Sequence, residues 1–142
     1  KIGAKGLEKA IDLIESGKVI AEKQDESLVT FVKPISKEQE VIDWSDTKEN
    51  IYNKIRGLNP FPGALSYYDD QIIKVYLSEK IDKEYDGENG EIVEILNKKG
   101  PVVKVKNGGI ILKEVKFQGK KSQSGIDIIN GRKIILNSKF GK

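Results

Sequence analysis

The chain of 142 residues contains no cysteine and no histidine. The absence of cysteine excludes disulfides, thiolate nucleophiles and cysteine metal sites. The absence of histidine removes the side chain that most readily exchanges protons near neutral pH, which is also the commonest metal ligand. Serine triads, zinc sites and most general-base mechanisms are therefore excluded, and only a carboxylate or lysine mechanism would remain. We expect neither a catalytic residue nor a metal site in this sequence.

Long apolar runs are also missing. No stretch of eighteen apolar residues occurs, so no segment should span a membrane, and the first residues show no signal-peptide pattern. The chain begins with Lys1 instead of methionine, so we expect a processed protein or a fragment. Its length suits one domain with an arm or linker. We expect it to act as a cytoplasmic monomer.

Acidic residues are scarce in the last third of the chain. Residues 97–142 carry twelve basic and two acidic side chains, a net charge of +10, although the whole chain carries only +3. Residues 1–44 and 45–96 carry −2 and −5. Such asymmetry attracts polyanions over a Debye length of about 8 Å. A solubilising lysine-rich tail is the alternative, but these lysines follow a strand pattern, which favours polyanion binding.

Hydrophobic spacing divides the chain into three parts. Leu7, Ile11 and Ile14 recur at helical spacing before Gly17, which predicts an amphipathic helix with a left-handed cap. The polar stretch that follows has isolated apolar side chains and is typical of an extended arm. The predicted parts are a helix within residues 1–17, a linker over residues 18–43 and a domain over residues 44–142.

The predicted domain opens with a helix that Ser45 or Asp46 would cap, with Glu49 as the capping-box partner. The helix must stop before Pro60 and Pro62, because proline lacks an N–H and restricts the preceding residue. Short strand patterns and glycine-rich turns then favour a mainly β fold, a small oligonucleotide-binding (OB)-like barrel of five strands with short helices. The predicted strands cover residues 64–68, 72–81, 91–96, 102–106 and 110–117, followed by a helix over residues 124–130 and an extended piece over residues 134–136.

Carboxylates cluster at Asp69-Asp70 and in the segment from Asp82 to Glu88. Acid–base catalysis needs two carboxylates that converge in a cleft with separated pKa values. Both clusters instead coincide with predicted turns, where aspartate is favoured because it bonds to the local backbone. The second cluster also lacks the ligand spacing of a calcium loop. We assign no chemistry to either.

Basic residues of the last third form the predicted nucleic-acid contact. Lysine neutralises phosphates without reading bases, so such a set predicts binding to a nucleic-acid backbone. Aromatic side chains are sparse in this part of the sequence, which favours structured RNA over single strands. Arg56 is open to two interpretations, an RNA contact or a pairing with a carboxylate or with carbonyls at the helix end. The predicted nucleic-acid-binding residues are Lys98, Lys99, Lys104, Lys106, Lys116, Lys120, Lys121, Arg132 and Lys133.

The segment from Ile55 to Ala64 reads Ile-Arg-Gly-Leu-Asn-Pro-Phe-Pro-Gly-Ala. It resembles the segment that opens the C-terminal domain of methionyl-tRNA formyltransferases, where an aromatic residue lies between two prolines. The similarity returns at residues 128–132, Ile-Ile-Asn-Gly-Arg, although Ile128 replaces the usual aromatic residue. The motif positions for which we expect structural roles are Trp44, Arg56, Gly57, Pro60, Pro62, Gly63, Asn130 and Gly131.

The resemblance implies a division of labour. Residues 1–17 are similar to the last helix of the family's N-terminal catalytic domain, which lies outside this sequence and would bind the co-substrate 10-formyltetrahydrofolate. No cofactor is expected here, and this chain alone should be inactive as a formyl group transferase. The barrel would hold its partner, initiator methionyl-tRNA, largely through phosphates. The alternatives are a C-terminal subdomain of a formyltetrahydrofolate dehydrogenase-like or nucleotide-sugar formyltransferase-like enzyme, or a structural docking barrel.

Overall fold

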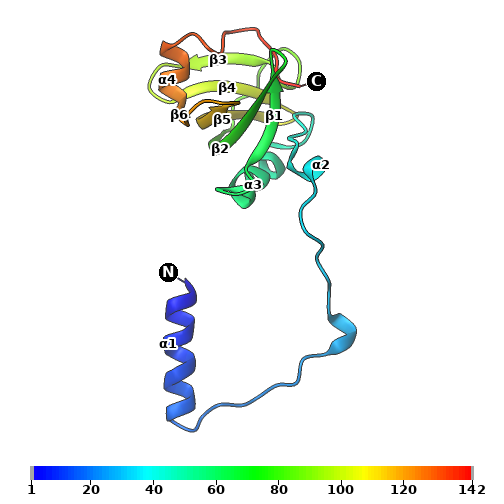
Figure 1. The fold of residues 1–142 in the computed structure, drawn as a ribbon, viewed down its shortest axis with the longest axis vertical. Helices are drawn as coiled ribbons and strands as arrows, with labels where there is room; N and C mark the ends of the chain where they lie inside the picture. The colour runs from blue at the N-terminus through cyan, green and yellow to red at the C-terminus, as the bar shows by residue number, and fades with distance from the viewer. Residues whose placement is uncertain (1, 142) are drawn as a thin grey trace. The chain divides into compact units, whose positions relative to one another are not determined.

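The computed structural model describes residues 2–141, and the chain divides into two compact units, Lys1–Pro34 and Ile35–Lys142 (Figure 1). In the first unit, helix α1 spans Ile2–Glu15 and a single 3-10 turn, η1, spans Glu26–Leu28. Gly17 has a φ of 65°, as the predicted left-handed cap requires. No residue of α1 or η1 is buried. Within residues 2–141, no helix is long and apolar enough to cross a membrane.

The second unit opens with helices α2, Lys37–Glu40, and α3, Lys48–Leu58. The three apolar residues that recur at helical spacing on α3 are all buried, so the apolar stripe of this amphipathic helix is covered by the rest of the unit. Residues just after α2 already belong to the packed body, because Val41 forms an isolated parallel bridge with Leu65 and Ile42 is buried.

The cap of α3 differs from the prediction. The N-cap is Thr47, whereas the sequence suggested one of the two residues before it. The Thr47 hydroxyl accepts a hydrogen bond from the Asn50 N–H at 3.3 Å. Asp46 instead accepts bonds from the Thr47 N–H (2.7 Å) and the Asn50 side chain (2.9 Å). Glu49 accepts a bond from Asn107 at 3.0 Å instead of forming a capping box. The polar residues before the helix therefore all find partners, but in a different arrangement.

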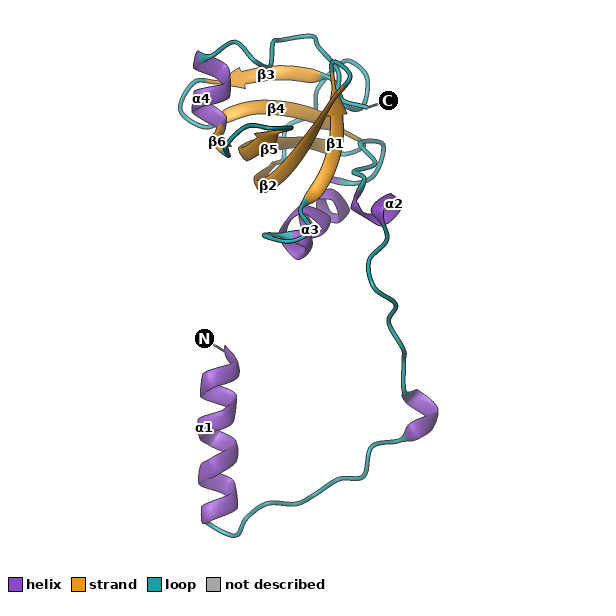
Figure 2. Ribbon diagram, in the orientation of Figure 1, coloured by secondary structure: helices purple, strands orange, loops and turns teal. Residues whose placement is uncertain are grey.

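Six strands form one antiparallel sheet in the order β1-β2-β5-β4-β3, with β6 paired to β5 (Figure 2). The predicted mainly β fold with short helices is confirmed, and all five predicted strands are present, whereas β6 was not predicted. Asp69 and Asp70 join β1 to β2 with φ values of 50° and 58°, as a tight hairpin turn requires. The strands span Ala64–Tyr68 (β1), Gln71–Ile81 (β2), Ile92–Leu96 (β3), Gly100–Val105 (β4), Gly108–Phe117 (β5) and Gln123–Ser124 (β6), and helix α4 spans Gly125–Asn130.

The last residues of the chain connect the two edges of the sheet. Phe140 bridges Tyr68 of β1, and Lys139 bridges Glu91 just before β3. The Phe140 N–H donates to the Gly90 carbonyl at 2.8 Å. The sheet is thereby brought toward closure, which is compatible with a small barrel.

The extended piece predicted over residues 134–136 is wrong. Those residues form no strand and run from a bend at Ile134 into a turn at Leu136. Here the Tyr68 hydroxyl accepts a bond from the Ile135 N–H (3.2 Å) and donates to Ser138 (2.7 Å). The apolar run Ile134 to Leu136 suggested a strand, but only Ile134 is buried. The backbone that pairs with the sheet begins beyond this turn.

The core of the second unit lies between the sheet, α3 and the closing segment. Trp44 packs against Phe140, with ring centroids 5.3 Å apart, and its indole N–H donates to the buried Ser66 hydroxyl at 2.8 Å. Helix α4 packs on the sheet through Gly125, where a Cβ atom would lie 2.1 Å from the Leu112 carbonyl oxygen. Close packing therefore fixes where the segments before and after α4, which carry basic residues, must lie.

Candidate nucleic-acid interface

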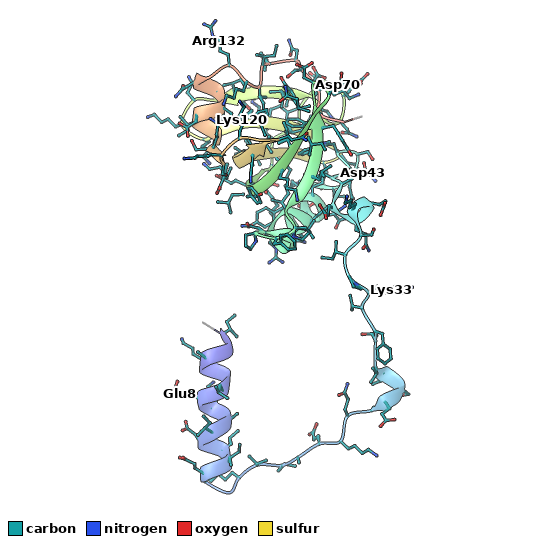
Figure 3. All side chains as sticks on the ribbon, viewed as in Figure 1. Glu8, Lys33, Asp43, Asp70, Lys120 and Arg132 are labelled. Carbon is teal, nitrogen blue, oxygen red and sulfur yellow. The ribbon has the colours of Figure 1, made fainter. Side chains whose placement is uncertain are left out.

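The nine predicted contact residues are distributed over four places in the second unit. They lie in the β3–β4 turn, on and just after β4, from the end of β5 into the loop before β6, and just after α4. All are exposed except Lys104, which is half-buried. In Figure 3, Lys120 and Arg132 project from the side of the unit that carries α4, whereas Asp43 lies near α2. The residues in these four places are Lys98 and Lys99, Lys104 and Lys106, Lys116, Lys120 and Lys121, and Arg132 and Lys133.

One group gathers around the β1–β2 turn. Lys120 and Lys133 line a hollow of about 250 Å³ together with Tyr68 and Asp69. Tyr68, Asp69 and Lys133 also line an adjoining hollow of about 380 Å³, which Arg132 and Lys139 complete. The four basic residues of these two hollows are called the basic end below: Lys120, Arg132, Lys133 and Lys139.

Local structure explains why these side chains converge. Helix α4 ends at Asn130, and Arg132 takes a φ of 49°, which turns the chain back toward the sheet. The Lys133 ammonium donates to the Gln123 side chain at 2.5 Å and lies 5.8 Å from the centre of the Phe117 ring. The Tyr68 hydroxyl holds the backbone beyond them, at Ile135.

None of the other predicted contacts lines either hollow of the basic end. Lys98 and Lys99 precede β4, whereas Lys106 follows it. The two ends of a six-residue strand lie roughly 17–20 Å apart. Lys104 and Lys106 line a separate hollow of about 140 Å³ with Glu84. The Lys104 ammonium lies 3.4 Å from the Asn89 side chain. The structure thus places this pair in a separate hollow beside the acidic loop.

The charges of the nine residues are largely uncompensated. Within residues 2–141, Lys99 alone among them has a carboxylate within ion-pair distance, because it bonds Glu79. That hydrogen bond holds the pKa of Glu79 below its ordinary value. Some lysines of the acidic middle third behave differently: Lys48 pairs with Asp82 at 2.9 Å, and Lys83 pairs with Glu94 at the same distance. Most basic side chains of the last third therefore keep a positive charge that no described carboxylate pairs with.

At the edge of the basic end, Lys139 is compensated. Its ammonium lies 2.5 Å from Glu88, and the pKa of Glu88 is lowered by this contact. Asp69 is the acid that lines both hollows of the basic end, and no ion pair joins it to a described residue. Lys120, Arg132 and Lys133 therefore remain available to an external anion.

The motif positions differ in their surroundings. Trp44 is buried, and Arg56 donates from Nε to Asn53 at 2.9 Å on the exposed side of α3. Gly57 is exposed, and Gly63 has a φ of 85° with Tyr76 packed so closely that a Cβ would lie 2.8 Å from that ring. Pro60 and Pro62 both follow cis peptide bonds, and Asn130 and Gly131 end α4.

Two partners of the basic end were not foreseen. Tyr68 and Asp69 line it because the hairpin meets the segment after α4, and Tyr68 contacts Ile135 across 67 positions of sequence. No local pattern encodes such a contact. As for metal ligands, the described residues include no cluster of three or more acidic side chains placed to hold an ion.

Comparison with known proteins shows the family of the chain. Residues 34–133 match the family model described as formyl transferase, C-terminal domain. The chain belongs to this family. The formyl transferase C-terminal domain model includes both the motif around Pro60 and Pro62 and the segment through α4.

Curated relatives of this formyl transferase C-terminal domain are methionyl-tRNA formyltransferases. The chain is 48% identical to the one from Fusobacterium nucleatum over 98% of its own length, and 40% identical to the one from Bacillus cytotoxicus over 99%. It is 37% identical to the one from Dictyoglomus turgidum. The chain spans about 45% of the length of these relatives. The resemblance drawn from the sequence motif is confirmed.

Solved structures confirm the fold of this C-terminal domain. The crystal structure of HypX from Aquifex aeolicus in complex with tetrahydrofolic acid superposes with a TM-score of 0.68. The match covers 94% of this chain and 23% of HypX, with 14% sequence identity. At that identity the comparison speaks for the fold alone.

Proposed function

We propose that this chain is the tRNA-holding part of a methionyl-tRNA formyltransferase. It holds initiator methionyl-tRNA by largely non-specific contacts to phosphates. An N-terminal catalytic domain transfers the formyl group of 10-formyltetrahydrofolate to the methionyl amino group. The names of the curated relatives support this assignment of substrate and reaction. They also favour it over the alternatives without tRNA, namely other formyl-processing enzymes and a structural docking barrel.

The observation that carries the RNA contact is the uncompensated charge. Eight of the nine predicted residues have no carboxylate within ion-pair distance among residues 2–141, and three of them surround the two hollows of the basic end. An exposed ammonium with no internal partner gains most from a phosphate, since binding also releases condensed counterions from the RNA. Contacts of this kind fix the position of a nucleic acid without reading its sequence.

The transfer chemistry is assigned to the catalytic domain. The chain has no histidine and no cysteine, so its own proton-transfer groups would be carboxylates, lysines and tyrosines. Some carboxylates have shifted pKa values. Hydrogen bonds lower the pKa of Glu79, through Lys99, and the pKa of Glu94, through Tyr85. A lowered pKa makes a carboxylate a weaker base, which is the opposite of what a general base requires.

Electrophoretic mobility shift with initiator tRNA at several salt concentrations tests the proposal. Affinity should fall steeply between about 50 mM and about 200 mM salt, with a slope near −0.7 to −0.9 per phosphate contacted. The triple variant Lys120→Glu/Lys121→Glu/Arg132→Glu should bind at least about tenfold more weakly with a shallower slope, because each lost cation removes about one unit. The double variant Lys104→Glu/Lys106→Glu measures how much the two lysines of the separate hollow contribute to tRNA binding.

The matched control is Lys5→Glu/Lys9→Glu/Lys18→Glu, which changes the net charge equally at exposed positions of the first unit. It should reduce tRNA binding much less than the triple variant of the second unit. Equal binding by wild type and the second-unit triple variant, or wild-type binding that ignores salt, would refute the proposed RNA contact. A docking barrel would behave in that way.

A further inference from the structure

A large hollow lies on the outer face of β1 and β2, beside α2 and the proline-rich loop. It measures about 660 Å³. Phe61, between the two prolines, is 88% exposed at its rim, and Tyr67 and Tyr76 contribute half-buried rings from β1 and β2. Because these aromatic residues come from the acidic middle third of the sequence, the sequence pattern did not associate them with the basic residues. This surface is called the aromatic hollow below.

Lysines from three elements also line the aromatic hollow. They are Lys37 of α2, Lys74 of β2 and Lys116 of β5, and Lys116 lies directly opposite Lys74 in the register of the sheet. Lys74 is satisfied within the fold, since its ammonium lies 3.5 Å from Glu40 and donates to the Pro62 carbonyl. Among residues 2–141, no carboxylate lies within ion-pair distance of Lys37 or Lys116. Three cations and one carboxylate leave the hollow net positive.

The aromatic hollow adjoins the basic end. Phe117 lines both the aromatic hollow and the hollow that Lys120 and Lys133 share. A phosphate chain held at Lys120 and Lys133 therefore has a route past Phe117 to Lys116. A nucleotide that follows this route meets aromatic rings next to a free ammonium.

We propose that the aromatic hollow binds an unpaired nucleotide of the RNA, with its base stacked on Phe61 and its phosphate at Lys116. Aromatic rings beside backbone cations are the combination by which proteins bind single-stranded nucleic acid. The inference rests on the proposed RNA-holding function and extends it, because it assigns a contact to a base that has left the helical stack. A purely apolar protein partner would not need the unpaired lysines.

Two probes separate base stacking from phosphate binding. They are a fluorescein-labelled oligouridylate of about twelve nucleotides, within the span of one OB-type domain, and an RNA duplex of the same length. Phe61→Ala should weaken oligouridylate binding by roughly 5-fold to 150-fold, the measured range for removing one stacking ring. Duplex binding should change by less than about twofold, because helical RNA is held by its phosphates.

Further variants distinguish a stacked base from a general apolar contact. Phe61→Trp should restore oligouridylate binding, whereas Phe61→Leu should not, because leucine keeps apolar area but has no ring face. Phe31→Ala is the matched control, since Phe31 is a similarly exposed ring, at 93%, in the first unit. Photocrosslinking of bromouridine-substituted oligonucleotide should modify Phe61, Tyr67 or Tyr76, as located by mass spectrometry. Phe61 is exposed, so none of its variants should unfold the domain.

The outcomes keep this inference separate from the proposed function. If the chain binds duplex RNA but Phe61→Ala leaves oligouridylate affinity unchanged, the stacking site is refuted and the phosphate contact stands. Full oligouridylate affinity in Phe61→Leu would also refute stacking, because apolar area without a ring face would then be enough for binding. If wild type binds neither probe, the proposed RNA-holding function itself fails.

Discussion

The two units of the chain carry similar apolar side chains in opposite environments. Ile14 of α1 is 66% exposed, whereas Ile110 of β5 is completely buried. Helices α1 and α3 are both amphipathic, but only α3 covers its stripe within its own unit. Hydrophobic periodicity thus predicts that a helix forms. It does not predict whether the chain itself supplies the surface that covers the helix.

The difference follows from where the strands lie. All the buried hydrophobic residues of the core fall between Ile42 and Phe140, inside the second unit. Most helical stability in proteins comes from packing of an apolar face, not from helix propensity. The second unit should therefore behave as an independently stable body, and its stability should be insensitive to changes in the first.

The largest expected effect comes from emptying the core of the second unit. Ile110→Ala should lower its free energy of unfolding by about 2–5 kcal/mol, because it removes a buried side chain and leaves a cavity. The same substitution at Ile14 should change it by less than about 0.5 kcal/mol, as is usual for exposed positions. Urea unfolding followed by the fluorescence of Trp44, the single tryptophan, measures both. An equally large cost at Ile14 would mean that the α1 stripe is covered after all.

The next largest effect on stability should come from breaking a buried side-chain hydrogen bond in the second unit. Trp44→Phe removes the indole donor and leaves the Ser66 hydroxyl, 1% exposed, without it. A buried polar group that loses its partner costs about 1–3 kcal/mol. The double variant Trp44→Phe/Ser66→Ala should recover part of that loss, because both partners are then apolar. Because these variants lack the single tryptophan, their urea unfolding is followed by circular dichroism.

The matched control lies in the first unit. Ser27 and Asp25 form a hydrogen bond of 2.7 Å that is exposed to solvent. Ser27→Ala should leave the unfolding of the second unit unchanged, since water replaces the lost bond. If Ser66→Ala failed to rescue Trp44→Phe at all, the cost of the tryptophan change would be one of packing alone.

Local signals explain how much of the fold the sequence could predict. The Asp69-Asp70 turn and the paired prolines gave the strand and helix boundaries close to where they lie, because turn chemistry acts over a few residues. The β6 strand is two residues long and was missed. The closing segment was placed too early, since its pairing at Phe140 depends on Tyr68 and Gly90, far away in sequence.

The candidate site was only partly predictable for the same reason. Charge counting identified the basic last third, because net charge is a property of composition. It could not separate Lys104 and Lys106 from Lys120 and Arg132, because that separation depends on the length of β4 and the position of α4. The aromatic hollow was unforeseen, since Phe61 and Lys116 lie far apart in sequence and meet only through the register of β2 with β5.

The smallest expected effect is a pH dependence confined to the second unit. Hydrogen bonding to Lys99 lowers the pKa of Glu79, so the folded state binds this proton less readily than the unfolded chain. The ion pair therefore stabilises the fold above the ordinary carboxyl range, and that stabilisation is lost as the pH falls below this range and through the lowered pKa. Because the pair is partly exposed, its contribution should be small.

Glu79→Gln should slightly reduce stability at neutral pH and narrow the difference between urea midpoints at about pH 7 and about pH 3. Some difference should remain, because Glu88 and Glu94 also have lowered pKa values. Glu8→Gln on α1, where no described cation pairs with the carboxylate, should alter neither midpoint. If Glu79→Gln lost as much stability on acidification as wild type, the Lys99 contact would contribute nothing. The two units would then differ in their apolar packing but not in the use of their surface charges.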